Sequence, residues 1–253
     1  MNIRQIRNAT LVIEYGGKKF LIDPFLADQG AFPAFPNTPN QDKMNPLVSL
    51  PTSIREITDV DAVIVTHLHP DHFDEAAIEA LPKNLPIYAQ NEKDVATIKE
   101  AGFFNVQSLE HQPSFENIQL FKTSGQHGRG EITELTGDVC GVVLKHSAEK
   151  TLYIAGDTVW CDDVKEAIDT YEPGVIVVNG GAAQFLEGGP ITMTKEDIYH
   201  THQAAPNAKI IVSHMESLNH CLLTRDELKE DLKVKELSST IIVPNDGETL
   251  YNL

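Results

Sequence analysis

Three histidines and an aspartate lie close together in the segment THLHPDH, residues 66–72, directly after a short apolar run. Such a run is typical of a buried strand. Side chains two residues apart on an extended chain share a face, so His67 and His69 can bind one ion together. Asp71 and His72 follow where the chain turns, which directs them to a second position nearby. Imidazole and carboxylate ligands favour zinc, manganese or iron over calcium.

Three further candidate ligands each follow an apolar run. They are His127, Asp157 and His214. A single histidine in such a place is more often a solvated loop residue, because histidine is intermediate in burial. Their shared position at strand ends instead favours one site, assembled along one edge of a sheet.

Together these motifs resemble those of the metallo-β-lactamase fold superfamily of metallohydrolases. The resemblance covers nearly the whole chain, from Ile22-Asp23-Pro24 through residues 66–72 to Gly156-Asp157-Thr158 and Ser213-His214. Within the superfamily the chain is most similar to the branch that contains ascorbate-6-phosphate lactonase, which shares endings like residues 244–248. The resemblance implies an α/β fold, the four-layer αβ/βα metallo-β-lactamase sandwich.

The same resemblance implies a site for two divalent metal ions, zinc or manganese. In it the first ion is held by His67, His69 and His127, the second by Asp71, His72 and His214, and Asp157 bridges the two. Asp23 matches an early aspartate that lies behind the ions and orients their ligands. Some true β-lactamases carry a cysteine near the bridging position, so Asp157 argues against antibiotic hydrolysis as the native role.

Two ions that share a solvent oxygen would activate it for hydrolysis. The expected activity is that of a dinuclear, lactonase-like hydrolase of a small molecule, either a lactone or a phosphoester. Asp71 is the expected catalytic carboxylate, and His220 is a candidate general acid from its loop position, although a histidine there can equally be a structural donor. Arg129 could meet an anionic substrate group or be an ordinary surface ion pair. His111, His146, His200 and His202 have no comparable context.

Two other functions remain open. A metal-dependent phosphodiesterase or nuclease needs a basic groove, yet the net charge is −17 and no dense basic run is present. Such a charge repels polyanions, so a nucleic-acid partner is not expected. A metal-binding protein without turnover is the second alternative, and the complete set of seven ligands argues against it. A homo-oligomer is possible.

Length and composition fit one domain of residues 1–253, since 253 residues with 41% hydrophobic content can bury one large core. No apolar run approaches the ~20 residues of a membrane span and no leader pattern is present, so a cytoplasmic location without membrane association is expected. Cys140, Cys161 and Cys221 show no CxxC spacing. We expect them to be reduced packing residues.

Alternating strands and helices must position the ligands. A glycine pair at 16–17 predicts a hairpin within residues 2–22. Further strands are predicted at 62–66, 86–89, 118–123, 139–145, 151–155, 175–178, 209–213 and 240–243, and helices at 74–81, 92–101, 162–170, 194–203 and 224–232. Thr194, three residues before Asp197, resembles a capping box at a helix start.

One long segment lacks this regularity. Residues 24–51 contain six of the 14 prolines together with Phe25, Phe32 and Phe35. A proline-rich stretch of this length is unsuited to a strand or helix and is often a binding loop. We expect it to form a wall or cover of the metal cleft, or alternatively a subunit contact built on its aromatic residues.

Overall fold

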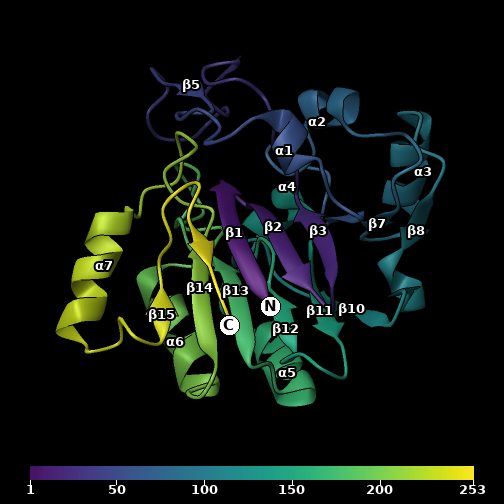
Figure 1. Cartoon of the computed structure of the whole chain (residues 1–253). Helices are drawn as coiled ribbons and strands as arrows, with labels where there is room; N and C mark the ends of the chain where they lie inside the picture. Colours follow the sequence, from purple (N-terminus) through teal and green to yellow (C-terminus); the bar gives the residue numbers. More distant parts are fainter.

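Two seven-stranded sheets lie face to face in the computed structural model, which describes residues 1–253. Helices flank the pair of sheets (Figure 1). The first sheet has the order β16-β1-β2-β3-β6-β7-β8 and the second the order β15-β14-β13-β12-β11-β10-β9. Each sheet is antiparallel at one end and parallel at the other. Short turns join antiparallel neighbours such as β1 and β2 or β2 and β3, whereas the connections between parallel neighbours contain helices.

The strands are short, as is usual for a sandwich. Those of the first sheet are β1 (Asn2–Arg7), β2 (Thr10–Tyr15), β3 (Lys18–Ile22), β6 (Ala62–Val65), β7 (Ile87–Ala89), β8 (Val106–Ser108) and β16 (Thr249–Leu250). Those of the second are β9 (Ser114–Phe115), β10 (Ile118–Ser124), β11 (Cys140–Lys145), β12 (Leu152–Ile154), β13 (Val175–Asn179), β14 (Lys209–Ser213) and β15 (Ile241–Ile242). A separate small hairpin consists of β4 (Phe32–Pro33) and β5 (Met44–Asn45).

Seven α-helices and one 3₁₀ turn complete the chain. They are α1 (Ile54–Ile57), α2 (Glu75–Ala80), α3 (Glu92–Glu100), η1 (Leu109–His111), α4 (Ile132–Thr136), α5 (Asp162–Tyr171), α6 (Lys195–Ala204) and α7 (Arg225–Val234). Thr194 and Asp197 form the predicted capping box at the start of α6. None of the helices combines the length and apolarity that crossing a lipid bilayer requires.

Three buried clusters separate four layers. Ala62 and Ile64 of β6 point into the cluster between the sheets, while Val63 and Val65 point to the cluster beneath α1, α2 and α3. The alternation follows from the two-residue period of a strand. In the second sheet β13 alternates in the same way, between the central cluster and the cluster beneath α5, α6 and α7. Its strands are therefore apolar on both faces, as parallel strands covered on both sides must be.

Every predicted strand and helix is present, with ends shifted by at most a few residues. The predicted hairpin turns at Gly16 and Gly17, which both have positive φ (56° and 77°), as a tight turn between twisted strands requires. The sequence did not predict α1, α4, β8, β9, β16 or the small hairpin. These elements are two to five residues long, too short to show a hydrophobic period.

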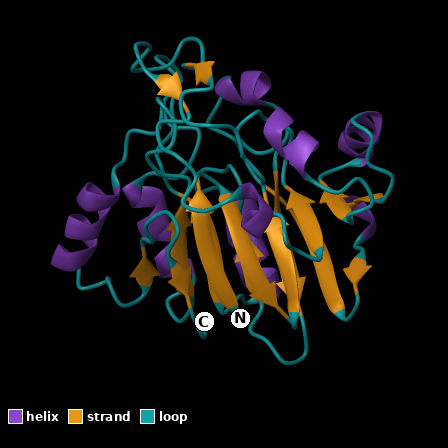
Figure 2. Cartoon of the chain, turned by 45° about the horizontal axis from the view of Figure 1, so that its top comes forward, coloured by secondary structure: helices purple, strands orange, loops and turns teal.

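Most of the loops gather above one end of the two sheets (Figure 2). The candidate ligands come from this end. His67 follows β6, Asp157 follows β12 and His214 follows β14. Because β6 and β14 lie in different sheets, the site lies across the edge of the sandwich, where both sheets contribute.

Candidate metal centre

The seven predicted ligands form two groups in the structure. His67, His69 and His127 make the first group, and Asp71, His72, Asp157 and His214 make the second. Within each group the potential ligand atoms all lie within 4.8 Å of one another. His127, Asp157 and His214 thus meet the residues of the motif, as their shared position at strand ends predicted.

The first group is built from imidazoles. The Nε2 atom of His67 lies 3.0 Å from Nδ1 of His69, so these nitrogens converge on one place. His127 turns its Nε2 toward the second group, 3.6 Å from Oδ2 of Asp157, while its Nδ1 donates to the carbonyl of Ile191 at 2.9 Å. That contact leaves Nε2 free of a proton and able to bind a cation.

Asp157 lies between the groups. Its Oδ2 is 3.2 Å from Nε2 of His72, 3.6 Å from Nε2 of His214 and 3.6 Å from Nε2 of His127. Its other oxygen, Oδ1, accepts a hydrogen bond from the side-chain amide of Asn179 at 2.7 Å. One oxygen is fixed by the protein and the other faces both groups, which is the arrangement that a bridging carboxylate needs.

Buried partners hold the remaining ligands in place. Asp23 accepts hydrogen bonds from Nδ1 of His72 at 2.9 Å and from the hydroxyl and backbone N–H of Thr66, both at 2.7 Å. The amide of Asn8 donates to Oδ2 of Asp71 at 3.2 Å. Asp23 therefore lies where the resemblance implies, behind the ligands, and fixes the orientation of the His72 ring.

The ligand atoms are better arranged to bind a cation than to hydrogen-bond with one another. Nε2 of His72 is buried without a hydrogen-bond partner, although carboxylate oxygens of Asp157 and Asp71 lie 3.2 and 3.5 Å away. A bare imidazole nitrogen and a carboxylate oxygen repel each other unless a proton or a metal ion lies between them. Five imidazoles and two carboxylates converging on buried space have the composition of a transition-metal or zinc site.

The electrostatics of the two groups differ. Burial lowers the pKa of His67 well below its ordinary value, and neighbouring imidazoles add to this effect. Burial also acts against ionisation of Asp157, but the nearby His214 and His72 outweigh it and hold the pKa of Asp157 well below the usual range. Burial opposes a charge on His72 too, yet the surrounding carboxylates raise its pKa to about 10. The carboxylates of the second group are thus ionised, and their negative charge favours positive charge beside them, whether a proton on an imidazole or a metal ion.

His220, the candidate general acid, lies beside the centre. Its ring contacts Phe35 edge-on, with ring centroids 5.0 Å apart, and its Nδ1 is buried without a partner. Burial lowers the pKa of His220 to about 4, so the ring is neutral at pH 7. A neutral ring can donate from one N–H group, and its role as an acid in turnover stays a prediction.

A cavity of about 330 Å³ opens onto both groups. His69, His127, Asp71 and Asp157 line its polar side together with His220. Its apolar side consists of Phe35, Leu135, Phe185 and Ile191. The proline-rich segment therefore forms a wall of the metal cleft, as expected, through residues 35–38.

Asn219 fixes this wall to the loop that carries His214 and His220. Its Oδ1 accepts from the N–H of Phe35 and from the amide of Asn45, and its Nδ2 donates to Thr38 and to the carbonyl of Pro39. Asn219 is only 1% exposed. These buried bonds make the segment a fixed wall, because each lost partner would leave a polar group unsatisfied.

Replacing Asn219 with alanine is therefore expected to lower the free energy of unfolding by about 2–4 kcal/mol, since several buried polar groups lose their partner together. Urea unfolding monitored by tryptophan fluorescence measures the effect. Asn207→Ala is the matched control, because Asn207 is exposed. Equal stability of the two variants would contradict the role of Asn219.

The other polar candidates lie outside this arrangement. Arg129 is ion-paired, with its Nη2 2.6 Å from Oδ1 of Asp197 at the start of α6, which bears out the surface-ion-pair alternative. His111 pairs with Glu92 on the surface. All three cysteines are free thiols, as predicted. Cys221 is more than a packing residue, however, because its sulfur contacts Nδ1 of His214 at 3.5 Å.

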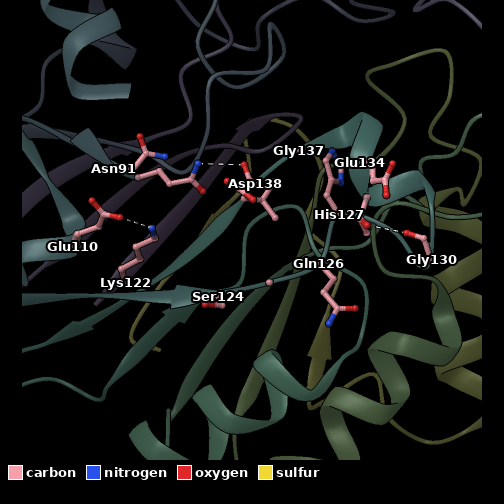
Figure 3. Close-up of a pocket in the computed structure, with 14 residues that line it drawn as sticks. Asn91, Glu110, Lys122, Ser124, Gln126, His127, Gly130, Glu134, Gly137 and Asp138 are labelled. Atoms are coloured by element: carbon pink, nitrogen blue, oxygen red, sulfur yellow. Dashed lines mark hydrogen bonds and ion pairs between the residues drawn. The ribbon is translucent and has the colours of Figure 1, made fainter. Parts of the chain in front are cut away.

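A larger polar groove of about 730 Å³ also borders His127 (Figure 3). Lys122 and Glu110 pair across part of it, and Glu134 and Asp138 lie on its wall. The groove touches His127 alone among the seven candidate ligands. The smaller cavity touches four of them, and it is therefore the candidate substrate site.

Sequence reasoning missed Asn8, Asn179, Asn219 and Cys221. Asn179 could have been found, because it ends the apolar run 175–178 in the same way that the ligands end theirs. Asn8 occupies the tight turn between β1 and β2 with φ of 52°, which gives it an ordinary structural explanation. No sequence signal distinguishes Asn219 or Cys221 from other loop residues.

Known proteins resemble this chain in sequence. A model described as the β-lactamase superfamily domain matches residues 18–215. The UPF0173 protein YddR of Bacillus subtilis is 58% identical over 251 residues, which cover 98% of this chain and 99% of YddR. A UPF0173 metal-dependent hydrolase of Caldivirga maquilingensis is 26% identical over 212 residues, covering 82% of this chain and 79% of that protein.

A solved structure is similar over the full length. The isothiocyanate hydrolase from Delia radicum gut bacteria superimposes with a TM-score of 0.95 and 46% identity, covering 100% of this chain and 99% of its own. These relatives do not test the resemblance to the ascorbate-6-phosphate lactonase branch, which stays a prediction. With its metallo-β-lactamase fold and its full-length match to YddR, the chain belongs to the β-lactamase superfamily and, within it, to the UPF0173 metal-dependent hydrolases.

Proposed function

We propose that this protein is a dinuclear metal-dependent hydrolase of a small, uncharged electrophile that carries an apolar substituent. Isothiocyanates are the first class to test and lactones the second. The observation that carries the proposal is the cavity beside the two ligand groups, which has carboxylates and imidazoles on one side and Phe35, Leu135 and Phe185 on the other. No lysine or arginine lines it.

The seven side chains described above would hold the two cations. Bound there, zinc or manganese would lower the pKa of a water molecule and polarise the substrate atom that it attacks. The protein's own contribution is positioning. Asn179 holds Oδ1 of Asp157, Asn8 holds Asp71, and the apolar wall excludes water from the substituent of the substrate.

For an isothiocyanate the expected reaction is R–N=C=S + H₂O → R–NH₂ + O=C=S. The oxygen of water bonds to the central carbon, the carbon–nitrogen bond breaks, and both protons of water end on nitrogen. Asp71 faces the cavity and is the candidate to accept the first proton. His220 lines the same cavity and is the candidate to deliver a proton to the leaving nitrogen.

Two features favour an uncharged substrate over a phosphoester. Apart from the two bound cations, a phosphate dianion in this cavity would find no positive group, because no lysine or arginine lines it, and the net charge of −17 opposes its approach. The relative with 46% identity is an isothiocyanate hydrolase, and isothiocyanates are uncharged. A lactone shares the uncharged carbonyl-type carbon and remains the second candidate.

The test is a parallel assay of zinc-loaded and manganese-loaded protein on benzyl isothiocyanate, a γ-lactone and an activated phosphodiester. Metal-dependent release of benzylamine above the other two rates supports the proposal. Faster opening of the lactone would make lactones, and not isothiocyanates, the proposed substrate class. Preferential cleavage of the phosphodiester would overturn it in favour of a phosphodiesterase, and two bound ions without turnover of any substrate would indicate a binding protein.

The apolar wall leads to a specific prediction. Phe185→Ala is expected to raise KM for benzyl isothiocyanate about tenfold with a smaller change in kcat, because burying an aromatic substituent against it is worth about 1–2 kcal/mol. Steady-state kinetics measure both constants. The neighbouring Leu186 is 68% exposed and does not line the cavity, so Leu186→Ala is the matched control. Equal KM values for the two variants would exclude Phe185 from the substrate site.

A further inference from the structure

Each buried histidine of the centre turns one ring nitrogen inward and the other toward a partner. For His72 the partner is a carboxylate oxygen of Asp23, and for His127 it is the carbonyl oxygen of Ile191, both at 2.9 Å. For His214 the partner is a sulfur, the thiol of Cys221, at 3.5 Å from Nδ1. Such partners select the tautomer and orientation of a metal-binding ring.

The backbone around His214 leaves little freedom. His214 has φ of +58°, a left-handed conformation that a non-glycine residue adopts only where its surroundings enforce it. Its N–H donates to the carbonyl of Asn8 at 2.9 Å. A Cβ atom at Gly181 would lie 2.1 Å from the carbonyl oxygen of His214 and 3.1 Å from the sulfur of Cys221. Gly181 therefore allows both residues to pack against the strand end.

This packing fixes the backbone of His214, but it does not determine which ring nitrogen carries the proton. On its inner side Nε2 lies 3.1 Å from Oδ2 of Asp71 and 3.6 Å from Oδ2 of Asp157. A proton on Nε2 would suit these carboxylates and would block a cation. The hydrogen-bond partner of Nδ1 is the sulfur of Cys221, so the sulfur is the group that can hold the proton on the outer nitrogen.

We infer that Cys221 is a positioning residue for His214, whose Nδ1–H donates to the Cys221 sulfur and so keeps Nε2 free for the second cation. The inference rests on the metal-binding role of His214 in the proposed function. A thiol is a weaker acceptor than the oxygens that serve His72 and His127. Serine at position 221 should preserve this function, because its hydroxyl also accepts a hydrogen bond. Alanine has no acceptor and should not preserve it.

Zinc titration against a chromophoric chelator tests the inference without reference to any substrate. Wild-type protein is expected to bind two ions. Cys221→Ala should weaken one of the two binding steps by about tenfold or more, the usual effect of losing such a partner, and leave the other unchanged. Cys221→Ser should stay within about threefold of the wild type on both steps. Cys161→Ala is the control, since the Cys161 thiol contacts Thr158 and Asp163 and none of the seven ligands.

Unchanged affinity in Cys221→Ala would overturn the inference. So would a serine variant as weak as the alanine variant, because packing volume and not the hydrogen bond would then be responsible. A single ion in the wild type would instead overturn the dinuclear proposal, which keeps the two failures distinguishable.

A nuclear magnetic resonance measurement covers the case in which the alanine variant does not fold. In zinc-loaded protein with ¹⁵N-labelled histidine, Nδ1 of His214 should carry an exchange-protected proton, and Cys221→Ser should shift that signal while those of His72 and His127 stay in place. A proton-free Nδ1, or a signal that the serine variant leaves unmoved, would contradict the inference.

Discussion

Replacing Asp157 with asparagine is expected to lower kcat/KM by about a thousandfold, equivalent to about 4 kcal/mol of transition-state stabilisation. The reason is the position of its Oδ2, which faces the ligands of both groups at 3.2 to 3.6 Å. An amide keeps the volume but loses the charge, and its NH₂ group would face imidazole nitrogens that need a cation. Kinetics with benzyl isothiocyanate and metal analysis of the same samples measure the two effects.

Asp169→Asn is the matched control for this experiment. Asp169 is exposed on α5 and pairs with Lys165 one helical turn away, a contact of little energetic value. The control should keep both ions and full activity. If Asp157→Asn also retained two ions and wild-type kcat/KM, then Asp157 would not bridge and the proposed arrangement would be wrong.

The sequence allowed prediction of the ligands because metal chemistry restricts residue types. Only a few types of side chain bind zinc or manganese, and the segment 66–72 contains four such side chains within six residues. His127, Asp157 and His214 could be added because strand ends at one sheet edge meet in space. The structure brings all seven together, as the pattern predicted.

Two residues that support the site, Asn219 behind the cavity wall and Cys221 beside His214, could not be predicted in this way. Asn219 and Cys221 act through hydrogen bonds to groups more than a hundred residues away or across a loop, and asparagine and cysteine have many ordinary roles. The short helix α4 was also missed, although its Leu135 helps to line the substrate cavity. Such features depend on tertiary packing, which overrides local propensity in segments of a few residues.

For the wall of the cavity, the sequence and the structure each supplied part of the description. The proline content of residues 24–51 indicated an irregular binding loop, but it did not say whether that loop covers the site or forms a subunit contact. The hydrogen bonds of Asn219 show that the segment lies against the site, because they attach Phe35 and Thr38 to the loop that bears His220. Substrate selectivity is therefore expected to depend on the fixed positions of these side chains.

Two histidine substitutions should separate chemistry from stability. His72→Ala and His69→Ala are both expected to abolish hydrolysis, since each removes a candidate ligand. Only His72→Ala should also lower the unfolding free energy of the chelator-treated protein, by about 3–5 kcal/mol. His72 is fully buried, 2.9 Å from Asp23 and 3.2 Å from Asp157, so its loss removes the imidazolium that neutralises these two buried carboxylates.

His69 is only half-buried, and its hydrogen-bonding contact is with another candidate ligand, His67. Its removal therefore creates no unpaired buried charge. Urea unfolding in the presence of a chelator, together with turnover of the zinc-loaded protein, gives both readouts, and His111→Ala on the surface is the control. Unchanged turnover in His69→Ala would refute the ligand assignment. A buried carboxylate that loses its cationic partner is destabilising. Equal stability of the two variants would therefore mean that His72 is not the group that neutralises the carboxylates around it.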